Sequence, residues 1–219
     1  MKKRAKSPWP TKAVMTQIYD KHLWGGREFD FYSGEGSHQI NIIEPYIAVV
    51  SEFLKSKNSA LRVCDLGCGD FNVGKHLTKY AKCYVGVDIV EPLINRNMIL
   101  FQRENLEFQC LDISKDDLPK ADCVILRQVL QHLSNGEIKE IIPKLYNYKY
   151  LILTEHLPLG DFTPNADKIT SLGNRLKYNS GVDLMAEPFN FNVLSSNVLN
   201  DISLGSKKGR LVTTLYQLS

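Results

Sequence analysis

Short, continuous apolar runs recur through the middle of the chain and alternate with segments whose apolar positions have helical spacing. A strand that is buried on both faces of a parallel sheet is apolar throughout, whereas an amphipathic helix repeats its apolar positions about once per turn. The alternation therefore predicts an α/β fold in which helices cover both faces of a doubly wound, mostly parallel sheet. The expected strands cover residues 61–66, 83–88, 106–111, 122–126 and 150–154.

Segments with helical spacing precede and separate these strands. In the first of them Ile43, Tyr46 and Val50 are among the apolar positions, and Pro45 stands near the start, where a helix tolerates proline. The expected helices cover residues 41–56, 73–81, 92–103 and 137–146.

The two ends of the chain lack this regular alternation. Residues 1–40 are irregular and rich in glycine, aromatic and polar residues, and we expect them to form an arm or lid on a single domain of residues 41–219. Residues 157–190 also show little pattern, and a segment of this length is usually a functional lid or disordered, so we expect an insertion beside the ligand site. Residues 191–199 and 210–218 alternate apolar and polar positions, which predicts a closing antiparallel hairpin and a seven-stranded sheet.

The composition fits one globular domain. The chain has 219 residues, of which 43% are hydrophobic, and this is enough for one sizeable core. Its 27 basic and 24 acidic residues give a net charge of +3, a balance that predicts no nucleic-acid footprint. The basic run Lys2-Lys3-Arg4 is expected to be a solvated tail.

Membrane insertion and secretion are not expected. No apolar stretch has the length of a membrane span, and no apolar core follows the positive N-terminus, as it would in a secretory signal. The five cysteines include no C-x-x-C pair, and we expect all but Cys68 to lie in buried strands as free thiols rather than in a zinc site. Free thiols are typical of a reducing compartment, so we expect the protein to be cytoplasmic.

Acidic residues and glycines follow the first three expected strands. Ligands of open α/β sheets bind beyond the carboxyl ends of the strands. Gly67 and Gly69 let the backbone turn sharply beside a ligand, and Asp88, nineteen residues after Gly69, can accept the hydrogen bonds of a ribose diol. Asp112 can accept the amino group of adenine. The alternatives are that Asp88 and Asp112 cap helices or turns, and that Asp65 is a structural acid bonded to loop amides.

These positions favour S-adenosylmethionine (SAM) over a dinucleotide. The nicotinamide and flavin fingerprint requires G-x-G-x-x-G, but Asn72 occupies the third glycine position. Asp65 stands two residues before Gly67, where a carboxylate would repel a pyrophosphate and suit the cationic ammonium and sulfonium of SAM. We therefore expect a SAM site.

Residues 60–155 resemble the class I SAM-dependent methyltransferase superfamily. The resemblance implies a Rossmann-like fold, SAM as the cofactor and methyl transfer as the reaction. Phe71 departs from the small residue that many members carry, and we expect its ring to shield the adenosine or methionine part of SAM. The motifs are Asp65-Leu66-Gly67-Cys68-Gly69, Val87-Asp88-Ile89, Leu111-Asp112-Ile113, and Asp122-Cys123-Val124-Ile125-Leu126 with Leu130-Gln131-His132-Leu133.

The strand ends and the resemblance together define the candidate cofactor site. Most of its members are the acids and glycines of the motifs, and apolar neighbours would cover the adenosine. The candidate cofactor-binding residues are Asp65, Gly67, Cys68, Gly69, Phe71, Asp88, Ile89, Asp112, Ile113 and Arg127.

Two histidines are candidate general bases. His132 follows the fourth strand by six residues, within reach of the transferred methyl group, and His156 follows the fifth strand. We expect Arg127, Gln128 and Trp24 to contact the acceptor. The alternatives are that His132 is a packed histidine and that Arg127 pairs with a surface acid. The histidines have no metal-like spacing, so no metal is expected.

Motifs near the ends resemble a bacterial subfamily that is often found beside genes for capsule or surface-glycan synthesis. The resemblance implies methylation of an oxygen on a small molecule, such as a sugar, a glycan or a phosphate-containing precursor of surface polysaccharide. The alternatives are a methyltransferase acting on RNA or protein and a SAM-binding module without catalysis. The sequence assigns no oligomeric state. The motifs include Leu23-Trp24-Gly25-Gly26, Ser33-Gly34-Glu35-Gly36-Ser37 and Ala186-Glu187-Pro188-Phe189-Asn190.

Overall fold

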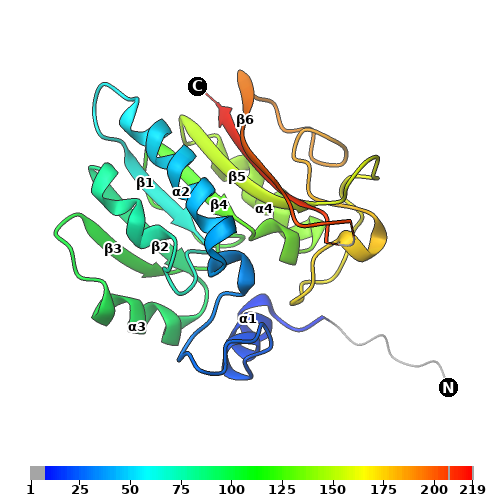
Figure 1. The fold of residues 1–219 in the computed structure, drawn as a ribbon, viewed down its shortest axis with the longest axis horizontal. Helices are drawn as coiled ribbons and strands as arrows, with labels where there is room; N and C mark the ends of the chain where they lie inside the picture. The colour runs from blue at the N-terminus through cyan, green and yellow to red at the C-terminus, as the bar shows by residue number, and fades with distance from the viewer. Residues whose placement is uncertain (1–7, 207, 219) are drawn as a thin grey trace.

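The computed structural model describes residues 8–206 and 208–218, and its centre is a seven-stranded sheet (Figure 1). The strand order is β3-β2-β1-β4-β5-β7-β6, with the first five strands parallel and β7 antiparallel to both β5 and β6. This confirms the doubly wound sheet with a C-terminal hairpin. The strands are β1 (Arg62–Leu66), β2 (Cys83–Asp88), β3 (Leu106–Cys110), β4 (Cys123–Arg127), β5 (Tyr150–Leu157), β6 (Ser195–Ser203) and β7 (Arg210–Gln217).

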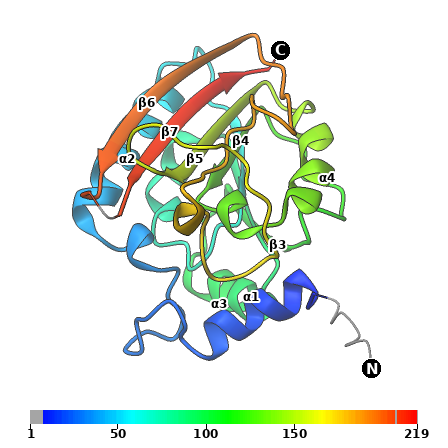
Figure 2. The same cartoon turned by 90° about the vertical axis from the view of Figure 1, so that its right-hand side faces the viewer.

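Helices lie on both faces of the sheet, as Figure 2 shows for α2 on one side and α4 on the other. Ser134 begins α4 with a capping box, because its hydroxyl accepts the amide of Glu137 while the Glu137 carboxylate accepts the amide of Ser134. The α-helices of the described residues are α1 (Thr11–Asp20), α2 (Ile40–Lys55), α3 (Glu91–Leu100) and α4 (Asn135–Leu145).

The two faces of the sheet bury two separate hydrophobic cores. Successive residues of β1 point to opposite faces, so Val63 joins the core under α2 while Cys64 joins the core under α4. The core under α4 also takes in residues 182–191, of which Leu184 and Phe191 are almost inaccessible. The last part of the expected insertion is therefore packed in the core under α4.

Several local expectations were wrong. The arm contains a ten-residue helix, α1, where an irregular segment was expected. Residues 73–81 form two short 3₁₀ turns, Gly74–His76 and Thr78–Tyr80, instead of one α-helix. This segment is short, and Gly74 both weakens a helix and packs so closely on Phe71 that a Cβ would lie 2.4 Å from its ring.

The cysteines also differ in part from the expectation. All five are free thiols, and Cys64 and Cys123 are buried in their strands, but Cys110 is exposed at the end of the edge strand β3. Cys83 is half-buried.

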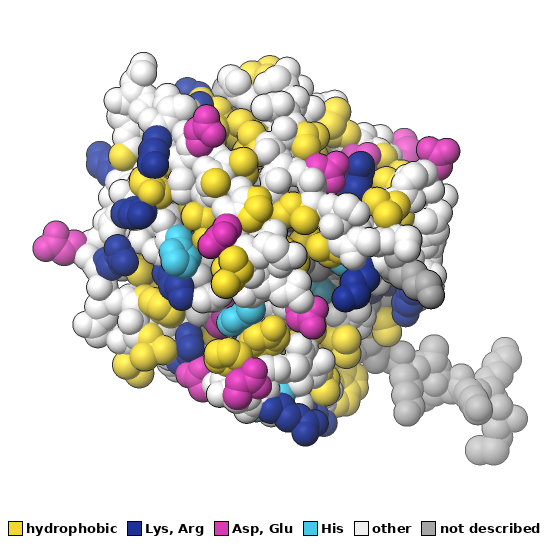
Figure 3. All heavy atoms as spheres, viewed as in Figure 1, with side chains coloured by type: hydrophobic (Ala, Val, Ile, Leu, Met, Phe, Trp, Pro, Cys, Tyr) yellow, Lys and Arg dark blue, Asp and Glu magenta, His cyan; other side chains and the backbone are white. Residues whose placement is uncertain are grey.

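The described residues form no long apolar helix, and the face drawn in Figure 3 carries charges of both signs. In the described part of the chain no helix has the length and apolar character needed to cross a bilayer. Figure 3 shows acidic and apolar side chains standing between the Lys and Arg side chains, which are more frequent toward the left of that view. The basic run Lys2-Lys3-Arg4 lies outside the described residues.

The topology places a ligand site at one end of the sheet. The connections after β1 and β4 lead in opposite directions, because β2 lies on one side of β1 and β4 on the other. Such a switch point opens a crevice at the carboxyl ends of the strands. Both ribbon views place α1 at this end of the sheet (Figures 1 and 2).

Candidate active site

A cavity of about 640 Å³ opens at the carboxyl ends of the parallel strands. It reaches from residues 111–114 after β3, past residues 67–69 after β1 (the glycine loop), to the turn between β6 and β7. Residues of α1 and of the rest of the arm form a further wall. The volume is typical of a site for one or two small organic molecules.

The glycine loop lines the cavity, and its two glycines let the backbone pass close to neighbouring side chains. Gly67 and Gly69 have φ values of +78° and +57°, which favour glycine. A Cβ on Gly67 would lie 2.4 Å from Val129, and one on Gly69 would lie 2.4 Å from the Ser33 hydroxyl. Any other residue at either position would strain the backbone and push its neighbour away.

Asp65 is buried at the end of β1 and lies in the cavity wall. One of its carboxylate oxygens accepts the hydroxyl of Tyr84 at 2.8 Å. Burial, reinforced by the nearby Asp88 carboxylate, raises the pKa of Asp65 to about 6, against the opposing effects of Tyr84 and Arg127. A cationic ligand group in the cavity would favour the ionised form of this carboxyl.

Asp88 lies in the wall at the end of β2. Its two carboxylate oxygens accept the amides of Gly69, at 3.1 Å, and Val90, at 3.0 Å. Burial raises the pKa of Asp88 to about 6 although these amides oppose the shift. The carboxylate thus joins the glycine loop to the start of α3 and retains lone pairs for a ligand.

Asp112 lies in the wall after β3 and also makes local contacts. Its carboxylate accepts the amide and hydroxyl of Ser114 and, at 2.7 Å, the ammonium of Lys115. Partial burial raises the pKa of Asp112, but Lys115 and Ser114 outweigh this effect and hold the pKa below its usual value. Asp112 therefore caps the turn after β3, which was the alternative expected from the sequence, and it also lies where it could contact a ligand.

The apolar candidates divide into two groups. Cys68, Ile89 and Ile113 line the cavity. Phe71 does not: its ring is fully buried among Tyr84, Phe101 and Phe108 in the core under α2. The expectation that Phe71 shields a ligand was wrong, because its left-handed backbone, with φ of +62°, belongs to the turn and its ring packs in the core.

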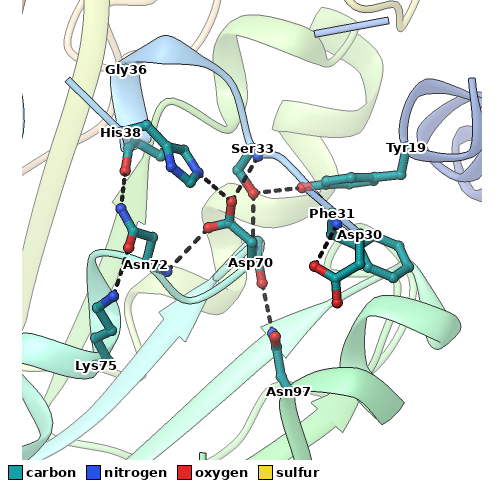
Figure 4. Close-up of polar contacts among 12 residues, drawn as sticks. Tyr19, Asp30, Phe31, Ser33, Gly36, His38, Asp70, Asn72, Lys75 and Asn97 are labelled. Carbon is teal, nitrogen blue, oxygen red and sulfur yellow. Dashed lines mark hydrogen bonds and ion pairs between the residues drawn. The ribbon is translucent and has the colours of Figure 1, made fainter. Parts of the chain in front are cut away.

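Asp70 fastens the arm to the glycine loop (Figure 4). Its carboxylate accepts the amide of Ser33 at 2.9 Å and pairs with the imidazole of His38 at 2.6 Å. The Ser33 hydroxyl accepts the Asp70 amide at 2.8 Å and lies 3.0 Å from the Tyr19 hydroxyl. Neither Asp70 nor His38 was among the site residues predicted from the sequence, since their contact joins residues far apart in the chain.

Arg127 is turned toward the arm. Its guanidinium donates to the Gly36 carbonyl and to the Ser37 hydroxyl, and it lies 4.8 Å from the centre of the Tyr46 ring. Gln128, the next residue, has φ of +58°. Its carboxamide packs against Gly36, because a Cβ added to Gly36 would lie 2.6 Å from it. Both side chains line the cavity, and Arg127 holds the arm through two of its nitrogens while its Nε has no hydrogen-bond partner.

His132 lies in the cavity wall on the short 3₁₀ turn Leu130–His132. Its Nε2 lies 3.1 Å from the Gln131 carboxamide nitrogen, and the Trp24 ring packs against the imidazole at 5.3 Å between centres. Burial, with Lys168 nearby, lowers the pKa of His132 to about 4. The imidazole is therefore neutral at physiological pH, as a proton acceptor must be.

His156 also lines the cavity, but both of its ring nitrogens are engaged. Nε2 donates to the Lys208 carbonyl, so Nδ1 accepts the Asn174 carboxamide at 3.1 Å. This imidazole cannot take a proton from an acceptor without losing the Asn174 contact. His132 has one engaged ring nitrogen, Nε2, beside the Gln131 carboxamide nitrogen, whereas its Nδ1 has no hydrogen-bond partner, so it is the candidate base with fewer contacts to break.

Arg175, which the sequence did not single out, fastens residues 157–190 to the segment that carries His132. Its side chain is completely buried and donates to the carbonyls of Leu130, Gln131 and Leu133. Glu155, also buried, lies nearby, and burial raises its pKa to about 8, against the attraction of Arg175. No periodicity or motif marks such an arginine, because its partners are backbone carbonyls some forty residues away.

Solved structures of methyltransferases share this fold. The N-methyltransferase NodS of Bradyrhizobium japonicum, in complex with S-adenosylhomocysteine, has 10% identity and a TM-score of 0.66, over 94% of this chain and all of that one. The 1,6-didemethyltoxoflavin-N1-methyltransferase of Burkholderia thailandensis has 14% identity and a TM-score of 0.63, over 98% of this chain and 94% of that one. At such identities the likeness concerns the fold.

Sequence comparisons place the chain in a family. The acetylserotonin O-methyltransferase of Homo sapiens is 32% identical over 89 residues, which are 39% of this chain and only 26% of that protein. A family model described as a methyltransferase domain matches residues 38–154, more than half of the chain. The chain therefore belongs to the methyltransferase domain family.

Proposed function

We propose that the chain is a SAM-dependent methyltransferase that methylates an oxygen of a small molecule. The observation that carries the proposal is that one cavity joins the glycine loop, Asp65 and Asp88 to His132. Membership of the methyltransferase domain family supports the reaction class. The NodS complex with S-adenosylhomocysteine supports the choice of cofactor.

The residues present fit SAM. Asp65 and Asp88 are buried carboxylates that would favour the cationic ammonium and the ribose hydroxyls, respectively. The backbone at Gly67 and Gly69 allows the close approach, and Ile89 and Ile113 offer apolar cover for adenine near Asp112. The cavity presents no row of cations for a pyrophosphate among the residues described, which fits a cofactor without phosphate.

SAM supplies an activated methyl group on a sulfonium. The task of the protein is to align an acceptor oxygen with that methyl group and to exclude water. When a hydroxyl is methylated, an oxygen–carbon bond forms, the sulfur–carbon bond breaks and the hydroxyl proton leaves. His132, held neutral in the wall, would take that proton.

The arm would act as the lid of this site. Asp70 and Arg127 hold Ser33, Gly36 and Ser37 over the glycine loop. Trp24 donates to the Leu172 carbonyl at 3.3 Å and so joins the arm to residues 157–190. We propose that acceptor entry requires these contacts to open and that their closure excludes water.

A sugar, glycan or other precursor of surface polysaccharide is the acceptor class that the sequence resemblance suggests. The acetylserotonin O-methyltransferase, as a relative that methylates a small molecule, supports a small acceptor. An acceptor as large as RNA or protein would have to displace the arm from the cavity, and this disfavours that alternative. The five free thiols support a reducing, cytoplasmic location.

Calorimetric titration of SAM into the wild type and Asp88→Ala tests the proposal. Loss of a buried carboxylate at the ribose should weaken SAM binding at least about ten-fold. Asp201→Ala is the matched control, because Asp201 pairs with Arg210 on the exposed face of the hairpin. Equal affinities for the wild type and Asp88→Ala would contradict the placement of the cofactor.

A further inference from the structure

The cavity has two ends of different chemistry. The end over β1, β2 and β3 carries the acids assigned above to the cofactor. The end over β4, β5 and β7 is lined by residues that no part of that assignment uses. Because the methyl group must lie between the two, the second end is where an acceptor would be held.

Three leucines form one wall of this acceptor end. Leu176 comes from the loop that Arg175 fastens, Leu204 follows β6, and Leu211 lies in β7. Leu211 is paired with His156 across the β5–β7 ladder, so the two side chains share a face. Leu176 also lies 3.2 Å from the position of a Cβ on Gly209, which brings it to the same turn. The wall is suited to an apolar surface.

Uncharged polar groups also line this end of the cavity. Gln128, Gln131 and His132 follow β4 in one short segment and line the cavity. Among the described residues the Gln131 Oε1, the Gln128 Nε2 and the His132 Nδ1 are buried without a hydrogen-bond partner. Gln131 is 5% exposed, so an unsatisfied amide there is costly. Small shifts on ligand binding would let these groups pair with hydroxyls or amides.

The charges of the cavity oppose an anion. Within the described residues its wall contains Arg127 and Lys208 as cations; two nitrogens of Arg127 are bonded to Gly36 and Ser37, and its Nε is buried without a partner. Lys208 is exposed at the rim. The acids in the wall are Glu35, Asp65, Asp70, Asp88, Asp112 and Glu137.

We propose that the acceptor is an uncharged molecule with an apolar face, which packs on Leu176, Leu204 and Leu211 and turns its hydroxyl toward His132. The inference rests on the proposed function and narrows it. It makes phosphate-containing precursors poor candidates, because a phosphate would lose its water in a cavity whose cations are Arg127, bonded to the arm through two of its three nitrogens, and Lys208 at the rim.

A matched pair of probes tests this inference. Naphthol is an uncharged aromatic alcohol, and hydroxynaphthoic acid keeps the hydroxyl while adding a carboxylate. Each is titrated calorimetrically into the full chain, with and without S-adenosylhomocysteine, and glucose phosphate serves as an anionic sugar. We expect naphthol to bind at least about ten-fold more tightly than either anion.

The outcomes separate the two proposals. Equal or reversed affinities, or no binding of naphthol in either condition, would overturn the uncharged acceptor. Failure of S-adenosylhomocysteine to bind would instead count against the proposed function, and the naphthol comparison would still be made without it.

A pair of leucine variants locates the site. Leu176→Asp should weaken naphthol binding at least about ten-fold while leaving S-adenosylhomocysteine affinity unchanged, and Leu176→Met should keep most of the naphthol affinity. Leu159→Asp is the control, since Leu159 is exposed in the same segment and lies outside the cavity. If Leu159→Asp and Leu176→Asp have the same effect, the leucine wall is not the binding surface.

Discussion

The two ends of the cavity are built in different ways. At the cofactor end the acids and glycines lie at or just beyond the ends of strands, as Asp65 is the next-to-last residue of β1 and Asp88 is the last residue of β2. At the acceptor end the wall combines Trp24 from the arm, Gln131 after β4, Leu176 from a loop and Leu211 from the hairpin. The cofactor end is thus fixed by the sheet, whereas the acceptor end depends on how separate segments are held together.

This difference has a consequence for specificity. The cofactor end can stay the same while the arm, the 157–190 segment and the hairpin turn change, because none of them forms the strands that position Asp65 and Asp88. Loops on a rigid scaffold commonly carry the variable part of a site. We therefore expect variants of the acceptor end to alter turnover with little effect on SAM affinity.

The largest effect is expected from His132→Ala. Loss of the base should lower kcat about 10²- to 10⁴-fold for a hydroxyl acceptor, with SAM affinity unchanged. The measurement is label transfer from SAM together with calorimetry. His76→Ala, at an exposed position, should leave both unchanged. Full turnover by His132→Ala would show that the acceptor end contains no base at this position.

The next largest effect is expected from Arg175→Met. The carbonyls of Leu130, Gln131 and Leu133 would lose their donors in the interior, so the free energy of unfolding should fall by about 3 kcal/mol or more. Denaturant unfolding measures this, with exposed Arg103→Met as a control expected to change it by less than about 0.5 kcal/mol. A loss no larger than that of the control would mean that the 157–190 segment is not fastened through Arg175.

A smaller effect is expected from a change of pH, which alters the ionisation of Asp65 and Asp88 at the cofactor end. Asp65 and Asp88 have pKa values of about 6, above the usual value, so without ligand their contribution to stability is fully present below about pH 4 and is lost as pH rises through 6. SAM favours the ionised forms, so its affinity should fall several-fold as pH decreases from 7 to 5.

Thermal unfolding at several pH values, with and without SAM, measures both the stability of the chain and its affinity for SAM. The SAM-induced rise in Tm should grow between pH 5 and pH 7, and Asp88→Ala should reduce that growth while Asp201→Ala keeps it. The neutral state of His132, whose pKa is about 4, should make kcat at saturating SAM independent of pH in the same range. A pH-independent SAM affinity would show that these carboxyls do not contact the cofactor.

The same difference explains what could be predicted from the sequence. Strand identity, the sheet with its hairpin and the positions of Asp65, Asp88 and Asp112 follow from local patterns, since each residue is adjacent to the strand that positions it. The Asp70–His38 pair and the Arg175 contacts join residues that are distant in the chain, so no local sequence pattern predicts them. Phe71 was misplaced because neighbours in sequence can point to opposite sides of a turn.

The most direct test of the central claim is a competition between two cofactors in one titration series. Calorimetry with SAM and with NAD⁺ should show one SAM bound per chain, displaced by S-adenosylhomocysteine, and no binding of NAD⁺. Binding of NAD⁺ without binding of SAM would contradict the account, because it would mean that Asp65 and the glycine loop receive a pyrophosphate.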